Sequence, residues 1–498
     1  MGVIKRQGVK YSLMAYFGAF IGMLNTLYFY PRFFTAEELG LVRFLLDTAS
    51  LVAPLLLIGA PNIAIKFFPA LKDKASGNHG FLAFLLTYAA LAFLLFGVLL
   101  LFFYPSLVEY YANRDPLFEA YFYALFFICA LYGLSVLIQR YSHNFRRIVI
   151  PTLIHDYSVK IGTPLTAGLY FFGWLSLDGV VQMLILIFLF DLLSQLIYLY
   201  RLGGLQFKPF GDVVRIVNWK KILEFGTFGL LGSLGFSLIF FLDSFMVGTF
   251  YSLTGLGIFG IAAAMANVMN IPFKAFNKIG APLISEAWEK ENLSDIQKLY
   301  KRSSTILLTT GFGVFILIWI NLQSLYDFMP NGEVYRAGQW VVFILGMSRL
   351  IDLATGLNAT VIGYSRYFKF NFYSMGVLAV ANIFLNLWLI PLFGINGAAL
   401  ATLISFFLFN LTRYLFIIFR FQMQPFGWNT LWIFISGAAV LLLFEYLPHT
   451  GGIVFDIFWR SSLAGLILLG LILVTNWSPD VKKLILDGWQ TVRGFLFK

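Results

Sequence analysis

The sequence predicts an all-α polytopic membrane protein with about 14 transmembrane helices. Of its 498 residues, 60% are hydrophobic and only 12% carry a charge. The hydrophobic residues form runs of membrane-spanning length, separated by Pro, Gly and charged clusters. About 14 such runs leave only short connections, so the length of the chain excludes a large extramembrane domain such as a nucleotide-binding fold.

The runs divide into two groups around a basic segment. We expect the first spans near residues 11–31, 41–66, 81–104, 118–139, 148–172 and 177–200. The later spans are expected near 222–248, 255–283, 303–325, 338–362, 369–391, 395–419, 428–447 and 457–477. This predicts an N-terminal six-helix lobe over 1–200, a cytoplasmic linker over 201–221 and a second six-helix lobe over 222–420. Two additional transmembrane helices and an amphipathic cytoplasmic tail then occupy 421–498.

The distribution of basic residues predicts the orientation. A net charge of +11 would suggest a nucleic-acid partner in a soluble chain, but in a polytopic chain it first reports which loops are cytoplasmic. If the N-terminus is cytoplasmic, the outer side holds few of the 35 Lys and Arg residues, namely Arg32, Arg43, Arg114, Arg336 and Arg460. We therefore expect both termini in the cytoplasm and no nucleic-acid partner.

Two short matches indicate an internal repeat. Leu39-Gly40-Leu41 opens the second span, and Leu256-Gly257-Ile258 opens the eighth. Leu177-Asp178-Gly179 and Ile395-Asn396-Gly397 open the sixth and twelfth spans, at an offset that differs from the first by a single position. Two parallel halves around a central cavity are typical of transporters that alternate access between the two sides of the membrane. Chance matching is the alternative, because glycine commonly begins membrane helices.

Charged and amide side chains within the spans are the candidate functional residues. A charge near the bilayer centre costs roughly 2.5 to 3.5 kcal/mol on insertion scales, so each one suggests a function. The candidates for binding substrate in the cavity are Arg43, Lys66, Lys160, Asn267, Asn270, Lys274, Lys278 and Arg349. The candidates for ion coupling are Asp243, which we place first, and Asp47, Asp156, Asp191 and Asp352.

One of these sets has helical spacing. Asn267, Asn270, Lys274 and Lys278 fall at i, i+3, i+7 and i+11, which predicts one polar stripe. Neither lysine has an acid at helical spacing on its own helix, so the stripe can offer positive charge to an anion. The alternatives are that the lysines extend to the cytoplasmic surface, that the asparagines bond between helices, and that Asp156 and Lys160 only neutralise each other.

The sequence lacks the motifs of several other functions. It contains no HExxH, Walker loop or GxSxG, and its His residues show no metal-ligand spacing. We therefore expect neither a metal nor a cofactor, nor an enzyme, although coupling to protons or sodium stays open. A membrane polymerase or ligase would need an extended outer loop, and the predicted outer loops are short.

Three segments resemble a known family. They are Asp243 through Met246-Val247-Gly248 to Gly257, then Ala281-Pro282-Leu283-Ile284-Ser285, and Phe393-Gly394-Ile395-Asn396-Gly397-Ala398-Ala399-Leu400-Ala401-Thr402. These segments and the helix pattern resemble the polysaccharide-transporter branch of the multidrug and oligosaccharidyl-lipid exporter superfamily, over essentially the whole chain.

The resemblance implies a flippase. Such a protein carries a polyprenyl-pyrophosphate-linked oligosaccharide from the cytoplasmic to the outer leaflet of the bacterial inner membrane, for cell-surface polysaccharides such as the O-antigen of lipopolysaccharide. It implies a monomer acting beside glycosyltransferases and a polysaccharide polymerase. The positive candidate cavity suits an anionic pyrophosphate. A cation-coupled multidrug exporter of the same fold and a flippase for peptidoglycan lipid precursors are the alternatives, and the identity of the glycan stays open.

Overall fold

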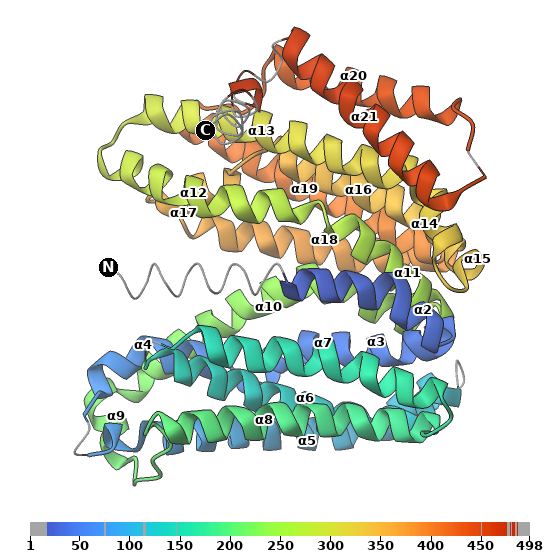
Figure 1. Cartoon of the computed structure of the whole chain (residues 1–498). Helices are drawn as coiled ribbons and strands as arrows, with labels where there is room; N and C mark the ends of the chain where they lie inside the picture. Colours follow the sequence, from blue (N-terminus) through green and yellow to red (C-terminus); the bar gives the residue numbers. More distant parts are fainter. Residues whose placement is uncertain are drawn as a thin grey trace, which may run out of the picture. The chain divides into compact units, whose positions relative to one another are not determined.

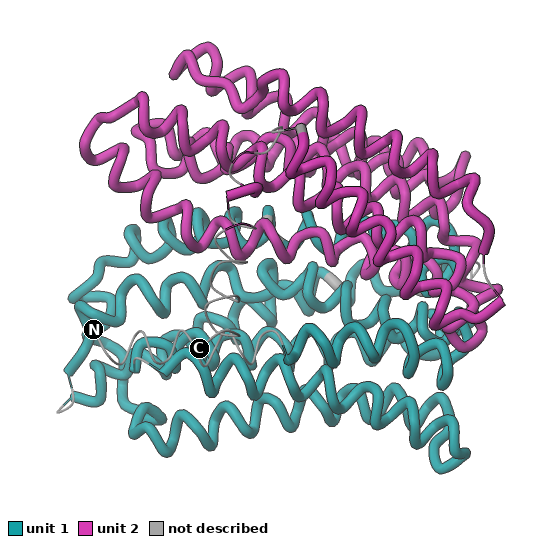
Figure 2. The backbone as a smooth tube through the Cα atoms, turned by 45° about the horizontal axis from the view of Figure 1, so that its top comes forward, with its two compact units in different colours: residues 1–257 teal, residues 258–498 magenta. Residues whose placement is uncertain are grey.

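The computed structural model describes residues 17–73, 76–112, 116–145, 147–449 and 451–475, together with 479, 481–483 and 486. The described residues form helices and connecting turns without a β-strand, which confirms the predicted all-α class. The chain divides into two compact units, residues 1–257 and 258–498 (Figure 2). Most of the predicted cytoplasmic tail lies outside the described residues, as does Arg114. The predicted lobe boundaries follow the repeat and stay predictions.

Unit 1 begins with helical residues 17–24 and contains short connecting helices as well as several long ones (Figure 1). Its elements are η1 (Asn25–Phe29), α2 (Tyr30–Phe33), α3 (Ala36–Leu57), α4 (Ala60–Leu71), η2 (Asn78–Gly80), α5 (Phe81–Ala112), α6 (Pro116–His143), α7 (Val149–Phe171), α8 (Leu177–Arg201), α9 (Gly211–Val217) and α10 (Trp219–Phe250). Helix α8 packs on α6 and α7, and α10 packs along α3 and α4. A core of buried Leu, Ile, Phe and Ala side chains lies where α4, α5 and α6 meet.

Unit 2 starts within α11 (Leu253–Asn267) and ends with the two additional helices. Its further elements are α12 (Asn270–Glu289), α13 (Leu293–Ile320), α14 (Leu322–Phe328), α15 (Gly332–Tyr335), η3 (Arg336–Gly338), α16 (Gln339–Ala354), α17 (Asn358–Tyr364), α18 (Phe370–Phe393), α19 (Ile395–Phe421), α20 (Trp428–Glu445) and α21 (Ile453–Thr475). Helix α19 packs on α16 and α18, and α13 packs on α12, α16 and α20. Its core is also apolar.

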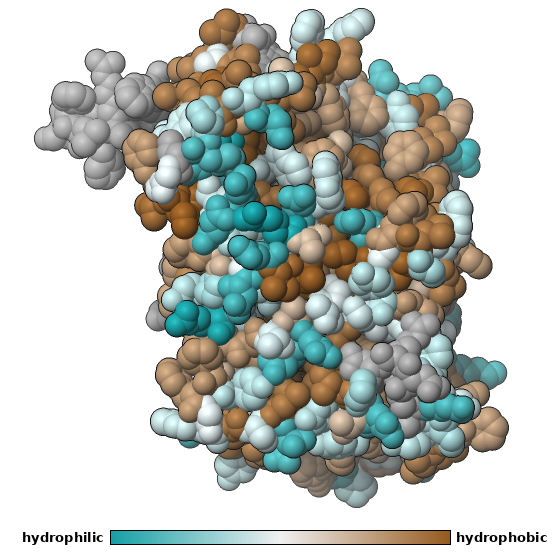
Figure 3. All heavy atoms as spheres, turned by 90° about the vertical axis from the view of Figure 1, so that its right-hand side faces the viewer, coloured by the Kyte–Doolittle hydropathy of each residue, from teal (hydrophilic) through white to brown (hydrophobic). Residues whose placement is uncertain are grey.

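The described helices are those of a multi-pass membrane protein. Ten of them are long and apolar enough to cross a bilayer, or up to 12 if each of two bent pairs is one span. Helix α7 occupies the predicted fifth span but is not among the ten, and it carries His155, Asp156 and Lys160. The start of the first predicted span lies outside the described residues, so the count of 14 stays a prediction. Figure 3 looks toward one end of the helices, where hydrophilic side chains are mixed with hydrophobic ones, as expected near a membrane surface.

Several spans that we predicted as single helices are broken. The ninth becomes α13 and α14, and the tenth becomes α16 and α17. The second predicted span becomes α3 and α4, because Ile58 and Gly59 adopt φ values of +42° and +74°. A Cβ on Gly59 would lie 2.1 Å from the carbonyl oxygen of Gly226, so only glycine permits α10 to approach at this break. The eighth predicted span becomes α11 and α12, which are bent by 43°.

A reciprocal close contact joins the starts of α3 and α11. A Cβ on Gly40 would lie 1.8 Å from the carbonyl oxygen of Leu253, and a Cβ on Gly257 would lie 2.0 Å from that of Ala36. The step along the chain from Ala36 to Leu253 equals the step from Gly40 to Gly257. Each helix therefore places its glycine on the first turn of the other, as in a contact between two equivalent surfaces.

The caps of these two helices repeat at the same offset. The Thr35 side chain accepts a hydrogen bond from the Glu38 amide at the start of α3. The Ser252 hydroxyl accepts one from the Gly255 amide at the start of α11. The offset from Thr35 to Ser252 is the one that relates the two glycines of the contact, so cap and contact together support the predicted repeat.

Candidate functional site: a polar cavity and two buried networks

A cavity of about 570 Å³ lies within unit 1, and we call it the unit 1 cavity. It is formed by α3, α4, α6, α7 and α10. Its polar lining residues are Ser50, Asn62, Tyr132, Gln139, Arg140, His155, Ser233 and Ser237. The Asn62 amide donates to the Gly229 carbonyl and to the Ser233 hydroxyl, both at 3.0 Å, and so joins α4 to α10. Since α10 is the first helix of the predicted second lobe, the cavity lies between helices of the two predicted lobes.

A buried acid adjoins this cavity through a histidine. Asp191 on α8 is 0% exposed, and its Oδ2 accepts a hydrogen bond from the Ser135 hydroxyl of α6 at 2.5 Å. The same oxygen lies 2.7 Å from Nδ1 of His155 on α7. His155 lines the cavity, whereas Asp191 does not. The histidine therefore connects the cavity to the buried carboxylate.

The surroundings of this histidine suit proton transfer. Imidazole is the side chain that ordinarily gains or loses a proton near neutral pH. The Tyr132 ring lies 5.4 Å from the His155 ring, and Arg140 also lines the cavity. Asp156, one residue further along α7, acts electrostatically on Tyr132. The cavity, His155 and Asp191 are thus joined by direct contacts.

Unit 2 contains a second buried network around Asn410 of α19. The Asn410 amide donates to Asp352 of α16 at 3.1 Å, and its oxygen accepts from Thr355 and Asn358, both at 2.8 Å. On the same helix Arg413 is 6% exposed and donates to the Ser374 hydroxyl of α18 at 2.9 Å. Its guanidinium also lies 3.9 Å from the centre of the Phe409 ring. Among the described residues the hydrogen bonds of Arg413 go to the neutral groups of Ser374 and Asn358, while the Asp352 carboxylate of the same network acts on it electrostatically from beyond salt-bridge distance.

The predicted polar stripe does not lie on one straight helix. Helix α11 ends at Asn267 and α12 begins at Asn270, because the backbone bends there. The Asn267 side-chain oxygen accepts from Asn270 at 3.2 Å and from Arg349 at 3.0 Å, so three of the predicted residues meet at the bend. Lys274 and Lys278 lie beyond it, exposed on α12. The structure therefore separates the stripe into a bonded amide cluster and an exposed pair of lysines.

The three predicted cations of unit 1 occupy separate helices. Arg43 is partly buried on α3, Lys66 is exposed on α4, and Lys160 is partly buried on α7. Lys66 lies 5.8 Å from the Phe225 ring, and Lys160 lies 6.0 Å from the Tyr157 ring. None of these three cations lines the unit 1 cavity, whose lining cation is Arg140.

The remaining predicted acids are also distributed. Asp47 lies one turn after Arg43 on α3 and is bonded to Ser244 of α10. Asp243 is partly buried beside that serine. Asp156 forms no ion pair with Lys160 in the described part of α7, so mutual neutralisation does not account for these two residues.

Sequence reasoning missed His155, Ser135, Arg140, Asn410 and Arg413. The histidines were examined for metal-ligand spacing along the chain, but the partner of His155 is 36 residues away on another helix. Asn410 and Arg413 lie well inside the span predicted over 395–419, where the cost of a polar or charged side chain in the bilayer is the signal that could have found them. The predicted repeat relates Arg413 to Gln195, because the two positions differ by the offset of the second sequence match. Both side chains are buried, so a polar residue at one position could have drawn attention to the other.

This architecture defines the class of the protein. It is a helical, multi-pass membrane protein with a polar cavity enclosed by its helices. No protein-family model matches the chain.

Comparison with known proteins identifies the fold. The chain shares it with the lipid II flippase MurJ in an inward closed conformation, at a TM-score of 0.75 and 12% identity, over 93% of this chain and 99% of that one. It also shares it with an inward-facing multidrug resistance MATE family transporter of the MOP superfamily, at a TM-score of 0.58 and 11% identity, over 81% of this chain and 94% of that one. These likenesses confirm the predicted resemblance at the level of the fold.

A sequence relative points in the same direction. The chain is 26% identical over 201 residues to the probable flippase AglR of Haloferax volcanii. The match spans 39% of each chain, so it covers about two fifths of the length of that relative. The curated relative and the structural neighbours are thus flippases and a transporter.

Proposed function

We propose that this protein is a flippase that moves a polyprenyl-pyrophosphate-linked oligosaccharide from the cytoplasmic to the outer leaflet of a cytoplasmic membrane, by alternating access, for cell-surface polysaccharide synthesis. The observation that carries the proposal is the fold, which over nearly the whole chain is shared with a flippase for a lipid-linked precursor. The similarity to a second probable flippase supports it. Glycosyltransferases and a polymerase would supply and consume its substrate.

The charges of the chain suit this substrate. A pyrophosphate is an anion, and Lys274 and Lys278 expose two cations on α12, which the predicted topology places near the cytoplasmic side. Arg140 adds a cation to the unit 1 cavity. A drug exporter for organic cations would instead need exposed acids in its cavity, and among the described residues no Asp or Glu lines the unit 1 cavity. The anionic substrate is therefore favoured.

The buried pair of His155 and Asp191 supports coupling to protons. A transporter that uses a proton gradient needs a group that takes up and releases a proton as the cavity changes its access, and His155 lies between the cavity and Asp191. We assign coupling to Asp191 before Asp243, because a titratable partner contacts Asp191. Sodium would require several oxygen ligands, and His155 supplies a nitrogen.

A reconstituted system tests the function directly. The purified chain is placed in liposomes that contain a fluorescent polyprenyl-pyrophosphate-linked saccharide, and exposure of the saccharide on the other leaflet is measured by an enzyme that reaches one face only. We expect translocation with this substrate. Parallel liposomes with lipid II or with ethidium test the alternatives, and faster transport of ethidium than of the lipid-linked saccharide would contradict the proposal.

Paired lysine variants test the anion-binding role. Lys274→Gln with Lys278→Gln should slow translocation about threefold to tenfold, because two favourable charges are lost near the pyrophosphate. The matched control replaces two other exposed lysines of unit 2 by glutamine, Lys290, which pairs with Glu286, and Lys298, which pairs with Asp295. Equal rates for the two double variants would remove Lys274 and Lys278 from the binding site.

A further inference from the structure

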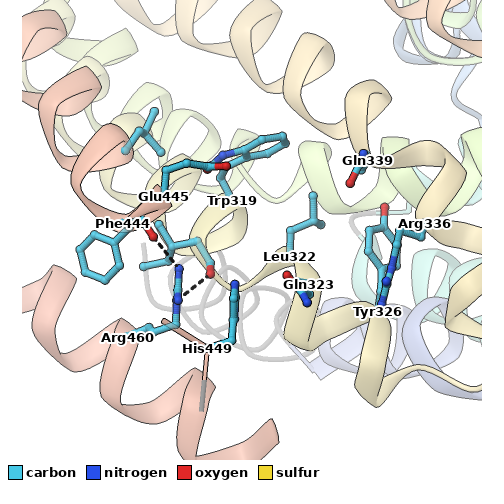
Figure 4. Close-up of a pocket in the computed structure, with 12 residues that line it drawn as sticks. Trp319, Leu322, Gln323, Tyr326, Arg336, Gln339, Phe444, Glu445, His449 and Arg460 are labelled. Carbon is cyan, nitrogen blue, oxygen red and sulfur yellow. Dashed lines mark hydrogen bonds between the residues drawn. The ribbon is translucent and has the colours of Figure 1, made fainter. Parts of the chain in front are cut away.

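A second cavity lies at the end of unit 2 where the predicted topology places the outer side of the membrane. This unit 2 cavity has a volume of about 300 Å³ and is lined from α13, α14, η3, α16, α20 and α21 (Figure 4). Neither the exposed lysines of α12 nor the networks described above belong to it. Its size is at the lower end of ligand-binding cavities, which suits one or two small rings.

Buried charged groups fix the frame of this cavity. Arg460 is 3% exposed, and its guanidinium donates to the carbonyl oxygens of Ile320, Phe444 and Leu447 at 3.0, 2.9 and 3.1 Å. These carbonyls lie at the ends of α13 and α20, so a single side chain holds both helix ends (Figure 4). Because Arg460 already donates to these carbonyls, we assign it to holding the helix ends together rather than to binding an anionic ligand.

A second buried charged group, Asp456, joins α21 to α14. Asp456 on α21 is 1% exposed and accepts from the Ser324 hydroxyl at 2.6 Å, and its Oδ2 lies 3.0 Å from Nδ1 of His449. The serine hydroxyl thus donates to the carboxylate rather than to the histidine, which is the wrong arrangement for a nucleophile activated by a base. The cavity therefore has the features of a binding site and not those of a hydrolase.

Two buried polar atoms facing this region have no partner. Tyr326 is 2% exposed and lines the cavity, yet its hydroxyl has no hydrogen-bond partner among the described residues. The same holds for Nε of Arg336, although its Nη2 pairs with Asp327 at 2.6 Å. A buried polar atom without a partner costs about 1 to 3 kcal/mol. Both atoms are closed to solvent in this structure, so a ligand in the cavity recovers this cost only if the neighbouring side chains shift to admit it. Figure 4 shows both side chains on the same side of the cavity as Gln339.

The charge and shape of the lining indicate the class of ligand. Arg336 is paired with Asp327, His449 with Asp456, and the donors of Arg460 are occupied by carbonyls. The other lining groups are the Trp319 ring, the exposed amides of Gln323 and Gln339, the Glu445 carboxylate and the apolar residues Ile320, Leu322, Leu441 and Phe444. An aromatic face surrounded by amide and hydroxyl groups without surplus positive charge suits a neutral ring with many hydroxyls rather than a phosphate.

We propose that the unit 2 cavity is a saccharide-binding site that receives the glycan of the lipid-linked substrate on the outer side of the membrane. The assignment of the glycan to that substrate rests on the proposed function. The binding itself does not, because a preformed cavity binds free sugars whether or not the protein transports. The cavity would hold the glycan end, while the pyrophosphate lies elsewhere.

Binding of free sugars to the purified full chain in detergent tests the site. The probes are glucose, galactose and N-acetylglucosamine, and inorganic pyrophosphate is the charged comparison. Saturation-transfer NMR and the fluorescence of Trp319, compared with Trp319→Phe, report binding. We expect at least one sugar to bind and pyrophosphate not to displace it. Binding of none of the sugars, or displacement by pyrophosphate, would overturn the proposal.

A matched pair of tyrosine variants locates the binding. Tyr326→Phe removes only the unpartnered hydroxyl and should weaken sugar binding about threefold to tenfold, the usual value of one hydrogen bond. The control is Tyr300→Phe, because Tyr300 is also fully buried in unit 2 with no partner for its hydroxyl among the described residues, but does not line the cavity. Equal effects of the two variants would contradict the site.

The lipid-linked oligosaccharide in the same detergent distinguishes the source of the glycan. It should displace the free sugar from the wild-type chain, and failure to do so would overturn the assignment to the substrate. Translocation in liposomes is measured separately. Sugar binding without translocation would refute the proposed function alone, whereas translocation without sugar binding would refute only this site.

Discussion

Two groups of three helices, one in each unit, carry a buried polar network at matching places in the predicted repeat. In unit 1 the network joins α6, α7 and α8, and in unit 2 it joins α16, α18 and α19 (Figure 1). Ser135 corresponds to Asp352 at the offset of the glycine contact. Gln195 corresponds to Arg413 at the offset of the second sequence match. The two networks therefore occupy equivalent positions, although their side chains differ.

The difference lies in the kind of charge that each network holds. Unit 1 pairs a buried carboxylate with a histidine, which can exchange a proton near neutral pH. Unit 2 buries an arginine, which keeps its charge across the whole physiological range. At matching places in the predicted repeat, one network thus holds a histidine beside its carboxylate and the other holds an arginine. Of these two networks, as the structure describes them, only that of unit 1 contains a histidine, so it is the one that we expect to contribute to pH dependence.

Removing the positive charge of Arg413 should cause the largest loss of stability. Arg413→Ala deprives Ser374 of its donor and leaves the nearby Asp352 without a compensating cation, so we expect a loss of about 3 kcal/mol in the free energy of unfolding. Its counterpart Gln195→Ala removes a neutral hydrogen bond to the Pro151 carbonyl and should cost about 1 kcal/mol. Thermal unfolding in detergent measures both, and equal losses would mean that the charge of Arg413 is not what distinguishes unit 2.

The glycine contact should show where the two halves are still equivalent. Gly40→Ala and Gly257→Ala each drive a methyl group into a carbonyl of the facing helix and should each cost about 2 kcal/mol of stability. Gly232→Ala and Gly313→Ala are the controls, because nothing lies within 4 Å of a Cβ at these positions. A large cost for one member of the contact pair and none for the other would contradict the reciprocal arrangement.

The smallest change in free energy is expected for a variant that alters the rate of transport. Asp191→Asn keeps the size of the side chain but removes its charge, and should slow translocation about tenfold, equivalent to about 1.4 kcal/mol. It should also flatten the dependence of the rate on pH between about 5 and 8, where histidine ordinarily titrates. Asp352→Asn is the comparison in unit 2 and should leave the shape of that profile unchanged. Rates in liposomes at several pH values would refute the assignment if both variants lost the pH dependence.

Part of the candidate site could be predicted from the sequence. Asp191 and Asp352 were recognised because an acid within an apolar run is costly, and both take part in the buried networks. Arg349, Asn267 and Asn270 were all predicted as polar residues of the cavity and do meet, although at a bend rather than along one helix. The sequence spacing of Asn267 and Asn270 predicted their contact because these residues are only three positions apart. The contact of Arg349 could not be predicted in this way, because Arg349 lies on α16.

The sequence by itself determined the membrane class, the approximate places of the helices and the repeat. These depend on hydrophobic runs and on offsets along the chain, which are local or periodic properties. Only the tertiary structure decided that His155 contacts Asp191, that Arg413 is buried and donates to neutral groups, and that the chain breaks at Gly59. Such features depend on which helices pack together, because their contacts join residues 36 to 167 positions apart in the sequence.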